Sequence, residues 1–292
     1  MTAAVASVAI PRLPADWQEW LAGSVVRGAG DDEMLAKMRA GGFDDYYARV
    51  AISVVRSLTE RAQQQVSAIA VDYQSDPLRL PAQARPRAAD REVTIGFALY
   101  NPNVALLADL ASAQECEKLM QLAAGKLRRS EVVDRGSGGH LVSHVRTSEG
   151  THFERGENAI VQRIEQRIAA LTGLPVENGE PLQILHYGTG GQYLPHHDYF
   201  DPADPGTAEQ VRHGGQRVAT VVIYLNDVAE GGETAFPELE LTVRPRQGSA
   251  VYFEYTNARG ELDARCLHAG APVARGEKWI ATKWLRQSAY QQ

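Results

Sequence analysis

The chain has 292 residues, of which 44% are hydrophobic and 23% charged, as in an ordinary globular protein. Its formal net charge of -6 argues against a broad nucleic-acid-binding surface. No stretch approaches the roughly 20 apolar residues that a membrane-spanning helix needs. The first 14 residues also lack the basic start and the long apolar core of a signal peptide. We therefore expect neither nucleic acid nor a membrane as a partner.

The cysteine content narrows the class of protein further. The chain has two cysteines, Cys116 and Cys266. They are too few for a disulfide framework or for a structural zinc site of the multi-cysteine kind. The simplest interpretation is two reduced thiols in a cytoplasmic protein.

The first part of the chain has helical periodicity. Trp17, Trp20 and Leu21 recur at helical spacing, and two more helical patterns follow over residues 31–38 and 43–65. The stretch 76–91 is rich in Pro, Arg, Ala and Asp and predicts a linker or an extended crossing segment. We expect an N-terminal helical region over residues 1–95 and a second region over residues 96–292.

The second region starts with helices and continues with strands. One helix is expected over 112–126, where Ser112 and Glu115 match a capping box, and another over 158–171, ending near Gly173. Beyond residue 180, short apolar runs alternate with turn residues, which indicates a mainly β sandwich or barrel. These runs are 182–187, 219–225, 241–243, 249–255 and 278–285. The polar stretch 201–216 is expected to be a surface loop or a lid at the mouth of a site.

Three residues have the chemistry of a metal site. His196 and Asp198 are two residues apart, and on a strand such residues point to one face while His197 points to the other. His268 supplies a third candidate ligand. Two histidines and one carboxylate form a facial triad that favours non-haem Fe(II). Zinc accepts the same ligands, and an isolated H-x-D is common among surface polar residues, so this pattern alone leaves the metal open.

A lysine lies ten residues beyond the third candidate ligand. Lys278 starts the last apolar run, where alternation places Lys278, Ile280, Thr282 and Trp284 on one face and Lys283 on the other. Lys278 is therefore expected to face the metal pocket, where it would pair with the distal carboxylate of a small diacid. The alternative is a solvated lysine at a strand end.

Several ordered segments resemble the catalytic domain of the prolyl 4-hydroxylases, over roughly residues 96–288. They are HVRTSEGTHF, HYGTGGQYLPHHDYF, RVATVVIYLNDVAEGGETAFPE, GSAVYFEY and LHAGAPVARGEKWIATKWLR. The resemblance implies an α+β fold, mainly β with flanking helices, built on a double-stranded β-helix, that is a jelly-roll core. It also implies an oxygenase dependent on Fe(II) and 2-oxoglutarate, with O2 as the oxidant and ascorbate as a further ligand.

The resemblance also assigns roles to individual residues. It implies that His196, Asp198 and His268 hold the iron, and that Lys278, assisted by Thr234 and Tyr187, binds 2-oxoglutarate. Arg146 and Trp284 match positions associated with the peptide substrate. Each has a simpler alternative: Thr234 ends a turn, Tyr187 and Trp284 are core aromatics, and Arg146 forms a surface ion pair.

The implied reaction resembles that of procollagen-proline 4-dioxygenases: peptidyl proline becomes 4-hydroxyproline, with release of succinate and CO2. The expected partner is a proline-containing peptide or protein, and the helical region is a candidate substrate-binding, dimer-forming or bracing element. Three alternatives stay open. They are hydroxylation of a free amino acid or small metabolite, a non-enzymatic jelly roll that keeps a metal site, and a zinc hydrolase with Glu233 as its base.

Overall fold

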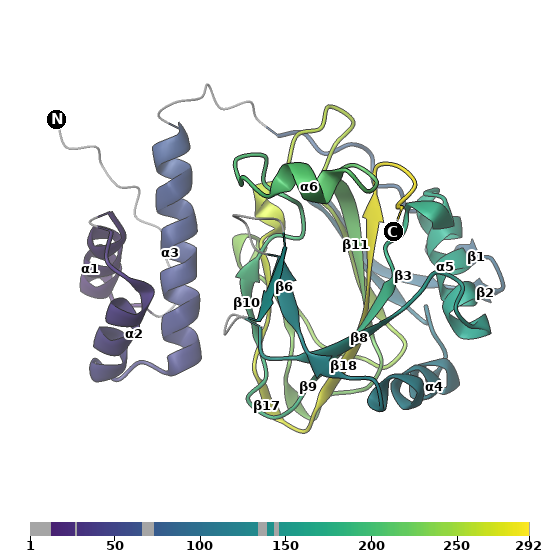
Figure 1. Ribbon diagram of the computed structural model, residues 1–292, viewed down its shortest axis with the longest axis horizontal. Helices are drawn as coiled ribbons and strands as arrows, with labels where there is room; N and C mark the ends of the chain where they lie inside the picture. The colour runs from purple at the N-terminus through teal and green to yellow at the C-terminus, as the bar shows by residue number, and fades with distance from the viewer. Residues whose placement is uncertain (1–12, 27, 66–72, 134–138, 143–145, 292) are drawn as a thin grey trace. The chain divides into compact units, whose positions relative to one another are not determined.

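The computed structural model describes residues 13–26, 28–65, 73–133, 139–142 and 146–291 (Figure 1). The chain divides into two compact units, residues 1–72 and 73–292, and each unit is described by itself. None of the helices in these ranges combines the length and the hydropathy that crossing a bilayer requires.

The first unit contains the three predicted helices, α1 (Ala15–Val26), α2 (Asp31–Ala40) and α3 (Asp45–Gln65). Apolar residues at helical spacing bring Leu21, Met34 and Met38 together in one small core. The ring of Trp17 packs edge-on against Phe43, with ring centroids 4.9 Å apart. These contacts give the unit a hydrophobic core of its own.

The division between the units lies upstream of the boundary predicted near residue 95. Residues 73–95 pack in the second unit, where Leu80 and Ala88 are buried. The Arg79 backbone N–H and its guanidinium both bind the buried Glu254 carboxylate. The Pro- and Arg-rich composition of this segment therefore predicts that it has little regular secondary structure. The composition does not predict that the segment packs against the second unit.

The second unit is built on two antiparallel sheets (Figure 1). Hydrogen-bonded neighbours in the eight-stranded sheet are, in order, β3 (Thr94–Tyr100), β4 (Asn103–Ala108), β15 (Ala250–Glu254), β11 (Arg217–Tyr224), β18 (Lys278–Arg286), β9 (Leu182–Tyr187), β8 (Glu149–Phe153) and β5 (Arg128–Arg129). The four-stranded sheet has the order β10 (Tyr193–His196), β16 (His268–Gly270), β13 (Thr234–Phe236) and β14 (Leu241–Val243).

Short elements complete the unit. Three two-stranded pairs are β1 (Arg87–Ala88) with β2 (Arg91–Glu92), β6 (Glu131–Val133) with β7 (His140–Val142), and β12 (Glu230–Gly231) with β17 (Val273–Arg275). The predicted loop 201–216 contains one helical turn and a half, α6 (Thr207–Val211). Arg286 Nη1 donates to the carbonyls of Gln210 and Gly215, which ties this loop to the large sheet.

Strand alternation separates two cores on the two faces of the eight-stranded sheet. On β11, Val221 and Ile223 face the core that includes α4 (Ala113–Ala124) and α5 (Ala159–Thr172). Val222 and Tyr224 face the opposite core, together with Phe236 and Val243 of the smaller sheet. The two sheets therefore sandwich an apolar core, the jelly-roll arrangement that was predicted, and the helices cover the other face of the large sheet.

The two helices predicted in this unit form within two residues of their expected bounds. Ser112 and Glu115 form the reciprocal capping box at the start of α4. The Asn158 side chain accepts from the backbone N–H groups of Ile160 and Val161, and Gly173 ends α5 in the left-handed conformation at φ 70°. The five predicted apolar runs are strands. Among the strands of five or more residues, β3, β4 and β8 were not predicted. The run TIGFALYNPNVALLA carries a signal for the first two, because Asn-Pro separates two apolar segments.

Candidate active site

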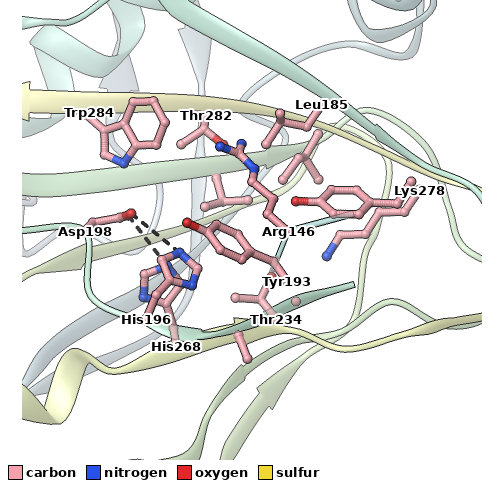
Figure 2. A pocket seen from close by; sticks show the side chains of 15 residues that line it. Arg146, Leu185, Tyr193, His196, Asp198, Thr234, His268, Lys278, Thr282 and Trp284 are labelled. Atoms are coloured by element: carbon pink, nitrogen blue, oxygen red, sulfur yellow. Dashed lines mark ion pairs between the residues drawn. The ribbon is translucent and has the colours of Figure 1, made fainter. Parts of the chain in front are cut away.

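The structure brings the three candidate metal ligands together between the two sheets. Each of His196, Asp198 and His268 offers one ligand atom, and these atoms lie within 4.8 Å of one another. The Asp198 carboxylate lies 3.7 Å from His196 Nε2 through Oδ1 and 3.6 Å from His268 Nε2 through Oδ2. Figure 2 shows the three side chains converging on one point. The spacing is that of ligands around one ion.

Hydrogen bonds orient both imidazole rings toward this point. His196 Nδ1 lies 2.8 Å from the Leu194 carbonyl oxygen, and His268 Nδ1 lies 3.1 Å from that of Cys266. Because a carbonyl only accepts, each Nδ1 must carry the proton, and the lone pair of each Nε2 faces the cluster. This is the tautomer that a metal ion needs.

The charges of the cluster also suit a divalent cation. Burial lowers the pKa of His196 well below its usual value, and the neighbouring His268 acts in the same direction. Burial alone would raise the pKa of Asp198, but the two histidines, Arg217 and the Thr220 hydroxyl hold it below its usual range. A neutral imidazole at His196 and an ionised carboxylate at Asp198 are the protonation states in which these two groups bind metal. The donor set therefore fits Fe(II), with zinc as a chemically equivalent occupant.

The backbone reaches this geometry differently from the expected alternation. Strand β10 ends at His196, so Asp198 lies beyond the strand in a bend. His197 nevertheless turns away from the cluster: its Nε2 lies 3.0 Å from the Ala264 carbonyl and its ring stacks on Tyr199. The alternation argument selected the two residues that converge, although the strand does not continue through Asp198.

Strand β18 forms one wall of the pocket. Lys278, Ile280, Thr282 and Trp284 all line it, as alternation predicted. Lys283 points to the opposite face, where its Nζ lies 2.5 Å from the Glu165 carboxylate of α5. Of the β18 residues that line the pocket, Lys278 is the one cation.

Lys278 is 3% exposed and lies in an apolar and aromatic environment. Its Nζ lies 5.7 Å from the ring centroid of Tyr187 and 5.9 Å from that of Tyr224. Burial lowers the pKa of Lys278 to about 8, although Glu233 acts in the opposite direction. The Glu233 carboxylate itself lies 4.0 Å from Arg244 Nε. Among the described residues no carboxylate forms an ion pair with Lys278, so the pocket is suited to a bound anion.

The other predicted site residues also line this pocket. Thr234 is buried, and its Oγ1 accepts a hydrogen bond from the Tyr224 hydroxyl at 2.8 Å. Tyr187 is directly opposite Lys278 in the β9–β18 register. Arg146 Nη2 donates to Gln183 Oε1 at 2.7 Å, and its guanidinium lies over the Tyr193 ring. Trp284 stacks under the Arg217 guanidinium at 4.0 Å.

Three residues of the site were not predicted from the sequence. Tyr193 stacks on His196 with ring centroids 3.6 Å apart, and Tyr224 binds Thr234. Thr220 donates to Asp198 Oδ2 at 2.7 Å. Alternation along β11 could have identified the last two, because Thr220, Val222 and Tyr224 share a face.

Comparisons with known proteins identify the family of the chain. The sequence profile of the 2OG-Fe(II) oxygenase superfamily matches residues 182–286. The chain is 40% identical over 210 residues to probable prolyl 4-hydroxylase 8 of Arabidopsis thaliana, covering 65% of this chain and 71% of the relative. Its identity to prolyl 4-hydroxylase 1 of the same plant is 43% over 206 residues, again covering 65% and 71%.

A solved structure gives the same picture of the fold. The viral collagen prolyl hydroxylase of Paramecium Bursaria Chlorella virus-1, in its 2OG complex, superposes with a TM-score of 0.50 at 30% identity. The match covers 63% of this chain and 95% of the viral protein. Together with the plant relatives, it shows that the chain belongs to the prolyl 4-hydroxylase family of Fe(II)- and 2-oxoglutarate-dependent dioxygenases.

Proposed function

We propose that this dioxygenase hydroxylates peptidyl proline to 4-hydroxyproline, while 2-oxoglutarate and O2 are converted to succinate and CO2. The observation that carries the proposal is one pocket that contains both the His196, Asp198 and His268 cluster and the buried cation of Lys278 (Figure 2). A scaffold that only held a metal would not need a buried lysine at this position, because burying an unpaired cation is costly.

In this proposal the three clustered residues hold Fe(II). The hydrogen bonds at Nδ1 of His196 and His268 keep both rings in the metal-binding tautomer. Three protein ligands on one side of an ion leave its other positions open to a co-substrate and to O2. When bound, iron with 2-oxoglutarate supplies the oxidising power that places one oxygen atom of O2 on the substrate carbon and the other in succinate.

Lys278 binds the distal carboxylate of 2-oxoglutarate. A Cβ on Gly270 would lie 3.8 Å from Lys278 Nζ, and Gly270 is two residues from His268 on β16. Two residues of a strand span roughly 7 Å, which is comparable to the length of a five-carbon diacid. Tyr187, opposite Lys278, and Thr234, held by Tyr224, flank the same part of the pocket.

Arg146, Tyr193 and Trp284 orient the peptide substrate. Arg146 and Tyr193 come from segments joined by an antiparallel bridge, and the guanidinium lies 5.0 Å from the ring centroid. Trp284 Nε1 is buried and has no hydrogen-bond partner among the described residues. A peptide carbonyl would accept a hydrogen bond from this N–H. A tryptophan that only packed in the core would leave the N–H unsatisfied, which costs free energy.

The remaining expectations from the sequence stay predictions. They are a proline-containing peptide or protein as partner, a homodimer, an ascorbate site and a cytoplasmic location. The first unit, with α1, α2 and α3, is the candidate for the dimer or for additional substrate contacts.

Succinate formation from 2-oxoglutarate tests the proposal. Protein loaded anaerobically with Fe(II) is exposed to air with a proline-rich peptide, with the same peptide carrying alanine at each proline, or with free proline. The proposal predicts succinate that rises with the proline peptide alone, one equivalent per oxygen atom gained by that peptide. If free proline stimulates succinate formation, or if neither peptide does, the substrate would instead be a free amino acid or another small molecule.

A further inference from the structure

The carboxylate of Asp198 is the end of a buried chain of hydroxyl groups. Thr220 Oγ1 lies 2.7 Å from Asp198 Oδ2 and 2.9 Å from the Tyr255 hydroxyl. Thr220 and Tyr255 are fully buried and Asp198 is 7% exposed. Neither hydroxyl belongs to the residues to which the sequence or the family resemblance assigned a role.

The direction of the hydrogen bonds in this chain is fixed. The ionised Asp198 carboxylate only accepts, so Thr220 must donate its single proton to Oδ2. Thr220 Oγ1 therefore accepts from Tyr255, which donates. Burial and the nearby Asp198 raise the pKa of Tyr255 well above its usual value, so the phenol keeps the proton that it donates.

The chain connects an irregular segment to the most regular part of the fold. Asp198 lies in a bend after β10, where no strand ladder sets its orientation. Thr220 lies in β11, with Phe253 of β15 opposite on one side and Trp284 of β18 on the other. Arg217 of β11 also donates to the Asp198 backbone carbonyl at 3.2 Å. Both the backbone and the side chain of Asp198 are thus held by one strand at the centre of the large sheet.

We propose that Thr220 and Tyr255 are positioning residues that fix the rotation of the Asp198 carboxylate and thereby tighten metal binding. This inference rests on the proposed metal site. Thr220 acts directly on the ligand and Tyr255 acts through Thr220, by keeping the threonine hydroxyl pointed at Oδ2. A threonine that only filled space in β11 would be replaceable by valine, which has the same shape without the donor.

The test measures the binding of Co(II) alone, in the absence of 2-oxoglutarate, by affinity and by the visible absorption of the bound ion. Thr220→Val is expected to weaken Co(II) affinity about 10- to 100-fold and to alter its absorption spectrum, as loss of a group that orients a metal ligand does. Thr220→Ser keeps the hydroxyl and is expected to bind Co(II) with an affinity close to that of the wild-type protein. Tyr255→Phe is expected to have a smaller effect of the same kind.

The double variant distinguishes a relay, in which Tyr255 acts on Asp198 only through Thr220, from two independent contributions to Co(II) affinity. Because Tyr255 acts through Thr220, Thr220→Val with Tyr255→Phe is expected to bind Co(II) no more weakly than Thr220→Val alone. Thr172→Val is the matched control, since it removes a buried hydroxyl that donates to the Ile168 carbonyl on α5. It is expected to lower the unfolding temperature without changing Co(II) affinity or spectrum.

The outcomes distinguish the relay from the metal site. If Thr220→Val is folded and keeps the affinity and spectrum of the unchanged protein, while Asp198→Ala loses Co(II), the relay is wrong and the metal site stands. Equal losses in Thr220→Val and Thr220→Ser would also overturn the relay, because serine keeps the donor. An unchanged protein that binds no Co(II) would overturn the metal site and the relay together.

Discussion

His196 and His268 lie directly opposite each other in the antiparallel pair β10 and β16, with ring centroids 4.3 Å apart. Side chains that are opposite across a ladder approach closely, so the pairing of two short strands is enough to bring two imidazoles to one point. Asp198, two residues beyond the end of β10, then supplies the carboxylate.

The first prediction compares two adjacent histidines. His196→Ala removes a candidate ligand. Loss of a group that only hydrogen-bonds to a metal ligand weakens metal binding by roughly 10- to 100-fold, so this variant is expected to lose at least as much metal affinity. His197→Ala is the control, because His197 points to the Ala264 carbonyl and lies outside the cluster. Metal titration with circular dichroism as a fold control measures both. Equal losses in the two variants would contradict the assignment of the ligands.

The second prediction follows from the lowered pKa of Lys278. Only the charged lysine attracts a carboxylate, and the amine of the free protein loses its proton as the pH rises through about 8. The dissociation constant for 2-oxoglutarate should therefore be flat below about pH 7 and rise by up to about tenfold per pH unit above pH 8. Calorimetry of the Mn(II)-loaded protein measures it.

Lys278→Met provides the control for this pH dependence. It is expected to bind 2-oxoglutarate weakly at every pH, with no inflection near pH 8. The lowered pKa of Lys278 also makes the free energy of unfolding depend on pH. Between the folded and unfolded pKa values the unfolded lysine binds more protons, so the contribution of Lys278 to stability rises with pH across that window. A pH-independent affinity in the unchanged protein would contradict the role of Lys278.

The third prediction concerns the orphaned N–H of Trp284. Trp284→Phe keeps an aromatic ring over Arg217 but removes Nε1. Loss of one hydrogen bond to the peptide should raise the KM for the peptide about 3- to 10-fold. The KM for 2-oxoglutarate should not change, since Lys278 lies at the other end of β18. Steady-state kinetics with each substrate varied in turn would refute the assignment if both constants rose together.

The fourth prediction concerns stability away from the pocket. Lys283 and Glu165 form a buried ion pair, in which Glu165 also accepts from the Gly156 backbone N–H. Glu165→Leu leaves a buried lysine without its partner and should cost about 3–5 kcal/mol of unfolding free energy. Adding Lys283→Met should recover much of that loss.

Chemical denaturation measures these free energies. Glu209→Gln is the matched control, because Glu209 pairs with Arg212 on the exposed surface of α6 and its loss should leave the denaturation midpoint unchanged. A double variant less stable than Glu165→Leu would show that the lysine stabilises the fold by something other than this pair.

Periodicity and capping made much of this fold predictable. The capping box at Ser112, the glycine at position 173 and the alternation along β18 each depend on local geometry that a few residues encode. The same alternation placed Lys278 in the pocket and Lys283 outside it, because a strand has two faces.

The features that could not be predicted from the sequence depend on contacts between residues far apart in the chain. Residues 76–91 have little regular secondary structure beyond the short strand β1 and the first residue of β2. They nevertheless pack against the large sheet through groups as distant in sequence as Glu254, and composition does not reveal this packing. Thr220 and Tyr193 act through neighbours that only the folded sheets bring close, His196 and Asp198 among them. Their residue types are common in any core. Alternation along β11 assigns Thr220 to the pocket face, but its contact with Asp198 depends on the folded chain.

The most direct test of the proposed reaction follows one oxygen atom. Fe(II)-loaded protein is incubated with 2-oxoglutarate, a proline-rich peptide and isotopically heavy O2, and the hydrolysed peptide is compared with standards of the hydroxyproline isomers. The proposal predicts one heavy oxygen atom in 4-hydroxyproline, and none with Asp198→Ala. Succinate that accumulates while every proline stays unmodified would contradict peptidyl proline as the substrate.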